Sequence, residues 1–294
     1  MSIENIQILG GSKGYGVYVR SDNVQIRNCY FNDMFKFVVQ PGSNNAWICD
    51  NQFIRSFQKG VEIYGDNNYF ARNTVDSTLN AFYVESGSNN VIIGNIIRNV
   101  GSGIVLIGCD NNIITNNIMN SITSGDAIHL EASDSNLISD NFISDVANWA
   151  FYGEDVDNNI ISGNIISYAS VGIFVNYNCF YQTIIGNEIS YATIYGIILR
   201  GSYSSITGNM ITYISSNTSS YISGVEVYGD YNSISGNIIS HVTNYNVMWD
   251  GIGIYINGLA EYCVVMGNVA QDCDINWLNQ NPTTIGNATT NSFS

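Results

Sequence analysis

Apolar and polar positions alternate along short segments of this chain, and the whole arrangement returns about every 22 residues. The segment Asn89–Asp110 reads NNVIIGNIIRNVGSGIVLIGCD. Nearly the same order of paired Asn and apolar pairs follows from Asn111, where it ends on Ala127-Ile128, and again from Asn158, where it ends on Gly172-Ile173. A repeat of this length is typical of stacked-coil architectures. We therefore predict that the chain is one unit repeated along its length.

An Asn stands before the second apolar pair of each repeat and gives the strongest signal in the sequence. Aligning on it gives a column made of Asn28, Asn51, Asn73, Asn95, Asn117, Asn141, Asn164, Asn187, Asn209, Asn237 and Asn268, with Gly10 in the same place in a shorter first turn. Large apolar residues, from Phe53 to Ile239, follow two positions later. Asn tolerates the left-handed backbone, and its amide can bond to the next Asn, so we expect this column at a corner.

Within a repeat the side chains alternate with a period of two, as in Gly60–Tyr64, which indicates short strands with one buried face. Stacking such strands at about 4.8 Å predicts an all-β, single-stranded parallel β-helix of about 11–12 coils. We place this domain at residues 1–274, with loop insertions near 215–222 and 243–250. Residues 275–294 are expected to form a polar tail or cap. No apolar run reaches about 18 residues, so no membrane span is predicted.

The motif NNxIIxNxI…GIxL, from about Asn5 to about Ala270, resembles the right-handed parallel β-helix proteins of the pectate-lyase-like superfamily. The resemblance implies a right-handed solenoid. That superfamily includes polysaccharide lyases, glycoside hydrolases, epimerases, viral tailspikes and adhesins, so the fold leaves the chemistry open. The Asp cluster of pectate lyases, the polygalacturonase signatures and the Asp-Pro-His-Asp signature of alginate epimerases are absent. These absences count against an enzyme.

Charge is distributed unevenly along the chain, whose net charge is −15. After residue 100 the acids are frequent and the only Lys or Arg is Arg200. Such a surface repels nucleic acid and anionic headgroups, so we expect neither as a partner. Cations, cationic surfaces and neutral sugars remain open, and a solvated acidic exterior is the simpler explanation. The six Cys form no CxxC pair, which argues against zinc.

The strand that follows the second corner carries aromatic and acidic residues at outward positions, which would form one lengthwise stripe. Aromatic faces stack on sugar rings and carboxylates accept their hydroxyl groups, so the stripe fits a glycan chain. We predict ligand-binding residues at Glu62, Tyr64, Tyr83, Trp149, Tyr152, Phe174, Tyr228 and Trp249, the last from the second insertion. Cross-strand pairing for sheet stability is the competing explanation.

Catalytic candidates within the stripe are Glu131, Glu154, Glu85 and His129. Equivalent carboxyls of Glu131 and Glu154 in adjacent coils would lie about 5 Å apart, near the separation of a retaining glycosidase pair. Glu85 and Glu131, two coils apart, would lie at about 9.6 Å, near the inverting range. We assign no metal site or cofactor. Weak Ca²⁺ binding would require oxygens of Asp126, Glu131 and Asp134 to converge.

Two further columns are interpreted as structural. Tyr168, Tyr191, Tyr213 and His241 would stack as a ladder. Asp66, Asp110, Asp134, Asp157 and Asp230 would accept backbone hydrogen bonds at turns.

These patterns predict an extracellular, cell-surface or virion-surface β-helix that binds a polysaccharide, a surface glycan or a partner protein. Acceptor sequences for glycosylation at Asn217 and Asn287 agree with that setting. One alternative is a carbohydrate-active enzyme, a hydrolase or lyase working in the aromatic and acidic stripe. Another is a purely structural shell or spacer subunit, whose coil ends are covered in a homo-oligomer or by other proteins.

Overall fold

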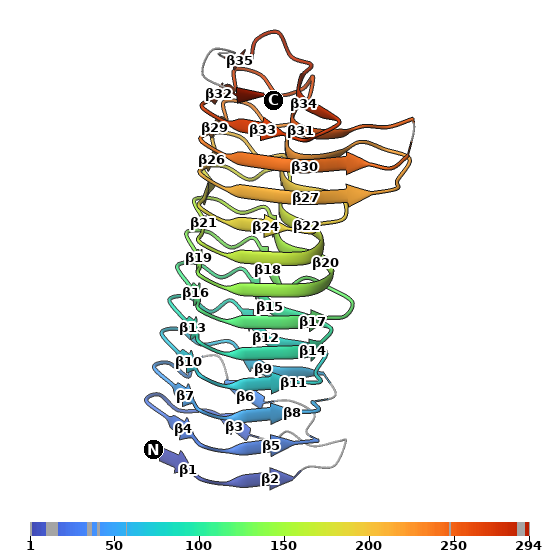
Figure 1. The fold of residues 1–294 in the computed structure, drawn as a ribbon. Coiled ribbons are helices and arrows are strands. Elements are labelled where there is room, and N and C mark those ends of the chain that lie inside the picture. Colours follow the sequence, from blue (N-terminus) through green and yellow to red (C-terminus); the bar gives the residue numbers. More distant parts are fainter. Residues whose placement is uncertain are drawn as a thin grey trace. The chain divides into compact units, whose positions relative to one another are not determined.

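A computed structural model describes residues 2–9, 17–33, 37–39, 42–56, 58–246, 248–286 and 292–293. The chain falls into two compact units, residues 1–147 and 148–294. Both units consist of short strands that pair in parallel with the coil before and the coil after (Figure 1). The parallel β-solenoid predicted from the repeat is thereby confirmed. In the described part of the chain no helix is long and apolar enough to cross a membrane.

Each coil of the first unit contributes one strand to each of three rows. The first row contains β1 (Ser2–Glu4), β4 (Gln25–Arg27), β7 (Trp47–Cys49), β10 (Tyr69–Ala71), β13 (Val91–Ile93), β16 (Ile113–Thr115) and β19 (Leu137–Ser139). The second row contains β2 (Gln7–Leu9), β5 (Tyr30–Asn32), β8 (Gln52–Ile54), β11 (Thr74–Asp76), β14 (Ile96–Val100), β17 (Ile118–Ile122) and the start of β20 (Phe142–Glu154). The third row contains β3 (Val17–Val19), β6 (Phe37–Val39), β9 (Lys59–Ile63), β12 (Asn80–Glu85), β15 (Ser102–Ile107) and β18 (Ile128–Glu131).

The second unit repeats the three rows. Its first row contains β21 (Ile160–Ser162), β23 (Thr183–Ile185), β26 (Ser205–Thr207), β29 (Ser233–Ser235), β32 (Val264–Met266) and β35 (Ile285–Gly286). Its second row contains the start of β22 (Ile165–Val175), β24 (Glu188–Ser190), β27 (Met210–Ser216), β30 (Ile238–Asn244), β33 (Val269–Gln271) and β36 (Ser292–Phe293). Its third row contains the end of β22, then β25 (Tyr195–Leu199), β28 (Ile222–Val227), β31 (Gly251–Ile256) and β34 (Ile275–Asn279).

The core consists of columns of apolar side chains that point inward from the middle of the strands. The large residues two positions after each column Asn, from Phe53 to Ile239, are fully buried, as predicted. In the third row the Gly-Ile step has a steric cause. A Cβ on Gly196 would lie 2.5 Å from the backbone oxygen of Gly224 in the next coil, so only Gly lets these coils approach.

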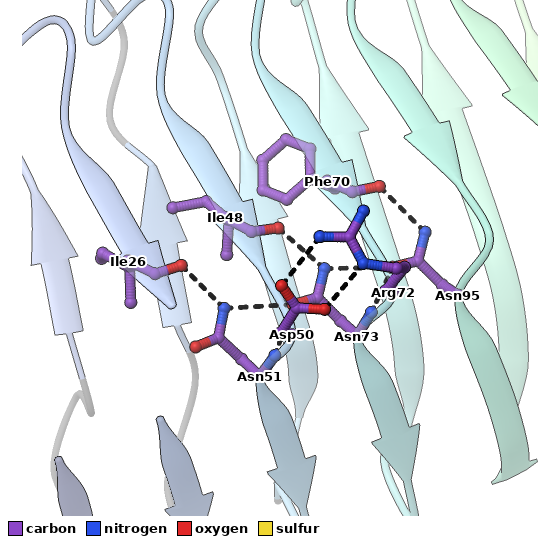
Figure 2. A network of polar contacts seen from close by, with 8 residues as sticks. All are labelled: Ile26, Ile48, Asp50, Asn51, Phe70, Arg72, Asn73 and Asn95. Carbon is purple, nitrogen blue, oxygen red and sulfur yellow. Dashed lines mark hydrogen bonds and ion pairs between the residues drawn. The ribbon is translucent and has the colours of Figure 1, made fainter. Parts of the chain in front are cut away.

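The predicted Asn column exists within each unit, and it is buried. The backbone N–H of Asn51 donates to Oδ1 of Asn73 (3.0 Å), and Asn73 donates likewise to Asn95 (2.9 Å). Each Nδ2 also donates to a strand carbonyl of the preceding coil, as Asn73 does to Ile48 O at 2.9 Å (Figure 2). Asn187, Asn209 and Asn237 form the same ladder in the second unit.

Three details of the Asn prediction are wrong. Gln52 pairs with Tyr30, so Cys29 rather than Asn28 lies opposite Asn51, and the Cys29 N–H donates to Asn51 Oδ1. Gln7 pairs with Tyr30 in turn, which gives Ile6 the place assigned to Gly10, itself outside the described residues. The left-handed corner is also not the ladder Asn but the residue before it, such as Asp50 (φ 60°) or Gly94 (φ 63°).

In the second unit, Tyr residues occupy two left-handed corners. Tyr168, Tyr191, Tyr213 and His241 all have φ between 55° and 57°, and their rings stack at 4.6–5.2 Å, which agrees with the structural interpretation. A second ladder, which we did not predict, contains Tyr181, Tyr203, Tyr231 and Tyr262. Ring stacking offsets part of the cost of a left-handed backbone at a bulky residue.

The insertions and the C-terminal segment are more regular than expected. Ser215 and Ser216 pair with Thr243 and Asn244, so part of each insertion extends a second-row strand. Residues 275–279 form β34, which pairs with β31, and the coil thus continues into the segment expected as a tail or cap. Asn217 follows β27 directly, whereas Asn287 lies outside the described residues.

The predicted turn role of the Asp column is borne out by hydrogen bonds between coils. Asp66 Oδ1 accepts from the Ser88 N–H, and Asp110 Oδ1 accepts from the Asp134 N–H. In the second unit Asp157 and Asp230 accept from Phe180 and Glu261.

Candidate functional site

The third row of the second unit presents two parallel columns of outward side chains. In one column Phe174 pairs with Ile198, Ile198 with Glu226, and Glu226 with Tyr255. Two residues further along each strand stand Asn176, Arg200, Tyr228 and Asn257, which form the second column. The predicted stripe therefore exists within this unit. All four residues of the first column are nevertheless buried, because neighbouring outward side chains cover them.

Glu226 is the central group of this face. Its side chain points away from the apolar core, yet the residue is only 3% exposed. Burial raises the pKa of its carboxyl, while hydrogen bonds from Tyr228 and Ser223 and the charge of Arg200 partly oppose the shift. Ser223 Oγ donates to Glu226 Oε2 at 3.3 Å. A carboxyl with this environment holds its proton to higher pH than an exposed Glu and can act as an acid.

Arg200, the only Lys or Arg in residues 148–294, lies beside Glu226. Its guanidinium lies 4.9 Å from the ring centre of Phe174, 5.0 Å from that of Tyr177 and 5.5 Å from that of Tyr228. One nitrogen donates weakly to Asn176 Oδ1 (3.5 Å), while the buried Nε has no acceptor among the described residues. A buried donor without an acceptor is costly, so this cation is available to a ligand.

Tyrosine hydroxyls complete the polar part of the face. Burial, followed by the charge of Glu226, raises the pKa of Tyr195 to about 12. Burial and the hydrogen bond with Glu226 also raise the pKa of Tyr228. Both hydroxyls therefore stay protonated near neutral pH. Tyr228 donates its proton to Glu226, and Tyr195 donates to the backbone oxygen of Tyr221 at 3.4 Å, so each hydroxyl oxygen can accept a hydrogen bond from a ligand.

Aromatic rings lie on both sides of these polar groups. Trp149 stacks on Tyr152 at 4.4 Å and meets Phe174 edge-on at 5.3 Å. On the other side Trp249, from the second insertion, meets Tyr221 edge-on at 5.0 Å. Tyr221 in turn contacts Tyr255 at 6.3 Å, next to Glu226. Half-buried aromatic rings around a few polar groups are typical of ligand sites.

In the first unit the corresponding face is closed by an ion pair. Glu62 is 2% exposed and accepts hydrogen bonds from Lys59 Nζ (2.8 Å) and from the Tyr64 hydroxyl (2.8 Å). Tyr83 pairs with Glu62 in the next coil, and Lys59 Nζ lies 3.1 Å from the centre of the Tyr83 ring. Burial, followed by Glu62, raises the pKa of Tyr64. The predicted ligand residues Glu62, Tyr64 and Tyr83 are therefore brought together, but they satisfy one another.

The predicted catalytic residues are placed as follows. Glu85 and Glu131 lie in one column with Ile107 between them, so they are two coils apart as expected. Glu154 accepts from the Tyr152 hydroxyl at 2.8 Å in the second unit, whereas Glu131 belongs to the first. The Glu131–Glu154 pair therefore stays a prediction. His129 Nδ1 lies 2.9 Å from Asp126 Oδ2.

The residues considered for Ca²⁺ have other contacts. Asp126 faces His129, and the Asp134 N–H donates to Asp110. Over the described ranges no three His, Cys, Asp or Glu side chains are grouped to hold a metal ion.

Glu226 stands two positions before Tyr228, so alternation along the strand also places it in the predicted stripe, but we did not single it out from the sequence. Its burial depends on neighbours such as Tyr195 and Tyr255, which lie about one coil away in each direction. One signal was available in the sequence, because Arg200 is an isolated cation in an acidic segment and its coil stacks on that of Glu226.

Comparison with known proteins gives a family and several structural neighbours. The family described as the right-handed β-helix region matches residues 1–117 and 59–211. The catalytic domain of a GH87 α-1,3-glucanase, solved with nigerose, superposes with a TM-score of 0.69 at 15% identity, over 99% of this chain and 64% of that one. This chain thus spans less than two thirds of the glucanase domain.

Two further solved structures share the fold. DFA-IIIase from Arthrobacter chlorophenolicus A6 has a TM-score of 0.68 at 10% identity, over 100% of this chain and 88% of that one. A variant of the periplasmic alginate epimerase AlgG has a TM-score of 0.58 at 12% identity, over 92% and 74%. No curated protein matches the sequence. At these identities the likeness is one of fold.

Proposed function

Since the chain belongs to the right-handed β-helix family, we propose that it is a carbohydrate-active enzyme that cleaves glycosidic bonds at Glu226. One observation carries the proposal: a carboxyl on the outward face of the solenoid is buried, has a raised pKa and is surrounded by tyrosine hydroxyls and a cation. Carboxyls with raised pKa values are how glycosidases protonate a leaving group near neutral pH. The carbohydrate chemistry named for the structural neighbours supports the same class.

In the proposed reaction Glu226 acts as general acid. It donates its proton to the glycosidic oxygen as the bond from that oxygen to the anomeric carbon breaks. The resulting carboxylate accepts a proton from the water that adds to the anomeric carbon, which restores the acid. Arg200 holds sugar oxygens by donating hydrogen bonds, and the hydroxyl oxygens of Tyr195 and Tyr228 accept hydrogen bonds from sugar hydroxyls. The rings of Trp149 and Trp249 bind apolar sugar faces.

Binding of a surface glycan without turnover is the second candidate. It is favoured by the absence of a carboxylate at the positions that pair with Glu226, which are Ile198 and Tyr255. A two-carboxylate mechanism requires a second acid within about 5–10 Å. In this case Glu226 would serve as a hydrogen-bond donor to the glycan.

Turnover assays on a polysaccharide panel separate the two candidates. We expect the wild-type protein to release reducing ends from at least one polysaccharide and Glu226→Gln to lose that activity at least a hundredfold, as for the loss of a general acid. Glu188→Gln is the matched control, because Glu188 is exposed on β24 in the second row. Retention of activity in Glu226→Gln would exclude the proposed role. Binding without product would favour the second candidate.

A further inference from the structure

The outward face of the first row carries a hollow in the first unit. Its volume is ≈ 340 Å³, near the lower end of the range of ligand pockets. The residues that line it are Gln25, Arg27, Trp47, Cys49, Asp50 and Arg72, and we call it the Trp47 pocket.

An exposed aromatic platform forms one wall of the Trp47 pocket. Trp47 is 52% exposed although it starts β7, and its ring contacts Tyr69 of the next coil at 4.6 Å with an interplanar angle of 48°. The register places the two residues directly opposite each other. A Trp that a fold leaves half exposed, beside a second ring and in a concave site, is typical of a recognition surface.

The charged residues that line the Trp47 pocket form a polar wall whose charges are already paired. Arg72 donates from Nε and Nη2 to the two carboxylate oxygens of Asp50, at 2.7 Å and 2.8 Å (Figure 2). Arg27 donates to Glu4 Oε1 at 2.7 Å. The hydrogen bonds from Arg72 are the main cause that holds the pKa of Asp50 below its ordinary value, and the charge of Arg27 adds to the effect. The wall therefore offers donors and acceptors together, with little excess charge to attract an anion.

The two remaining lining residues of the Trp47 pocket, Cys49 and Gln25, are uncharged. Burial raises the pKa of the Cys49 thiol to about 11, so the thiol stays protonated and unreactive near neutral pH. Gln25 adds an amide that both donates and accepts.

We infer that the Trp47 pocket binds one pyranose ring of a neutral glycan. A pyranose presents an apolar C–H face, which packs on an aromatic ring, and hydroxyl groups at its edge that both donate and accept. The Trp47 platform matches the face, and the Arg72–Asp50 pair with Gln25 matches the hydroxyls. An inorganic anion would need guanidinium groups whose charges are not already paired with carboxylates.

This site is separate from the Glu226 site, which lies on another row and in the other unit. It would anchor a glycan without taking part in bond cleavage. The inference therefore does not depend on Glu226 being catalytic, and Glu226→Gln serves as the background in which to measure it without turnover.

The test is ¹⁹F NMR of the full chain labelled with 5-fluorotryptophan, which replaces the four Trp of the sequence. The Trp47 resonance is assigned by its loss in Trp47→Phe. Maltohexaose, laminarihexaose and cellohexaose are titrated in the Glu226→Gln background. We expect at least one hexaose to shift the Trp47 resonance saturably, and Arg72→Gln to weaken that binding at least tenfold.

Arg98→Gln is the matched control, because Arg98 forms an equivalent exposed pair with Asp76 (2.7 Å) on the second row. It should bind like the parent protein, and thermal melting of each variant verifies the fold. The inference is overturned if no hexaose shifts the Trp47 resonance, or if Arg72→Gln and Arg98→Gln bind the hexaose alike. It is also overturned if an excess of phosphate of about tenfold over the hexaose displaces the bound hexaose, because that result would identify an anion site.

Discussion

The guanidinium of Arg200 lies 5.5 Å from the ring centre of Tyr228, whose hydroxyl bonds to the carboxyl of Glu226. This contact joins the only cation of the second unit to its buried outward acid through an aromatic residue. Burial raises the pKa of Glu226, while Arg200 keeps a positive charge nearby for the oxygens of a ligand.

Replacing Arg200 by Met tests this relationship. The charge of Arg200 lowers the pKa of Glu226, so its removal should raise that pKa further, whereas Arg200→Lys should leave it closer to the wild type. Glycan binding should weaken by about ten- to a hundredfold, since a charged hydrogen bond contributes about 1.5–3 kcal/mol. The measurement is a ¹³C NMR titration of the Glu226 side chain. An unchanged or lowered pKa in Arg200→Met would contradict the assignment.

Glu226→Gln should change the pH dependence of stability. Because the folded pKa lies above the ordinary value of 4.5, the stability that the protonated Glu226 contributes is fully present below pH 4.5 and is lost as pH rises through the folded pKa. Gln lacks this loss, so the variant should gain stability relative to the wild type across that window, by about 1.4 kcal/mol per pKa unit. Urea denaturation at several pH values measures it. A difference that is constant with pH would refute the account.

Asn95→Ala should destabilise the first unit. Asn95 accepts from the Asn73 N–H and donates to Phe70 O at 3.0 Å, and both groups are left buried without partners in the variant. Each such group costs about 1–3 kcal/mol, so we expect a loss of about 2–5 kcal/mol. Chemical denaturation gives the value.

The matched control is Asn116→Gly, at the left-handed corner (φ 55°) beside the ladder. Gly adopts this conformation without strain, so its effect should stay within about 1 kcal/mol. Equal effects of the two variants would show that the ladder is not what stabilises the coil.

Much of the fold was readable from the sequence because stacking places identical residues over one another. The Asn ladder is visible for that reason, since each Asn bonds to the Asn about one coil later. The start of the column was wrong because Asn28 and Cys29 are adjacent, and only the pairing of Tyr30 with Gln52 decides between them.

The site was less readable than the fold. Outward positions follow from alternation, but their burial does not, and it is burial that distinguishes Glu226 from Glu85 or Glu188. Glu62 was predicted to bind a ligand, but Lys59, three residues earlier, forms an ion pair with it, and alternation along the strand does not reveal that contact. Spacing along a strand does not reveal which large side chains fold across it.

Substitutions in the tyrosine ladder can separate the cost of the left-handed backbone from the stabilisation by ring stacking. Tyr191 has φ 56° and stacks at 5.0 Å on Tyr168 and 5.2 Å on Tyr213. Tyr191→Ala loses both ring pairs, each worth about 0.5–1.5 kcal/mol, and keeps the left-handed strain. Tyr191→Gly loses the rings but relieves the strain. In thermal unfolding we expect Tyr191→Phe to be nearly as stable as the wild type, Tyr191→Gly to be less stable, and Tyr191→Ala to be the least stable. A Tyr191→Ala variant more stable than Tyr191→Gly would contradict this account.

The most direct test of the central claim is the pH dependence of kcat on a polysaccharide that the panel identifies as a substrate. If Glu226 is the general acid, kcat falls as pH rises through the Glu226 pKa measured by ¹³C NMR, and Glu226→Gln loses turnover while Glu188→Gln follows the wild-type profile. Wild-type kcat in Glu226→Gln, or a falling limb that does not coincide with the titration of Glu226, would contradict the claim.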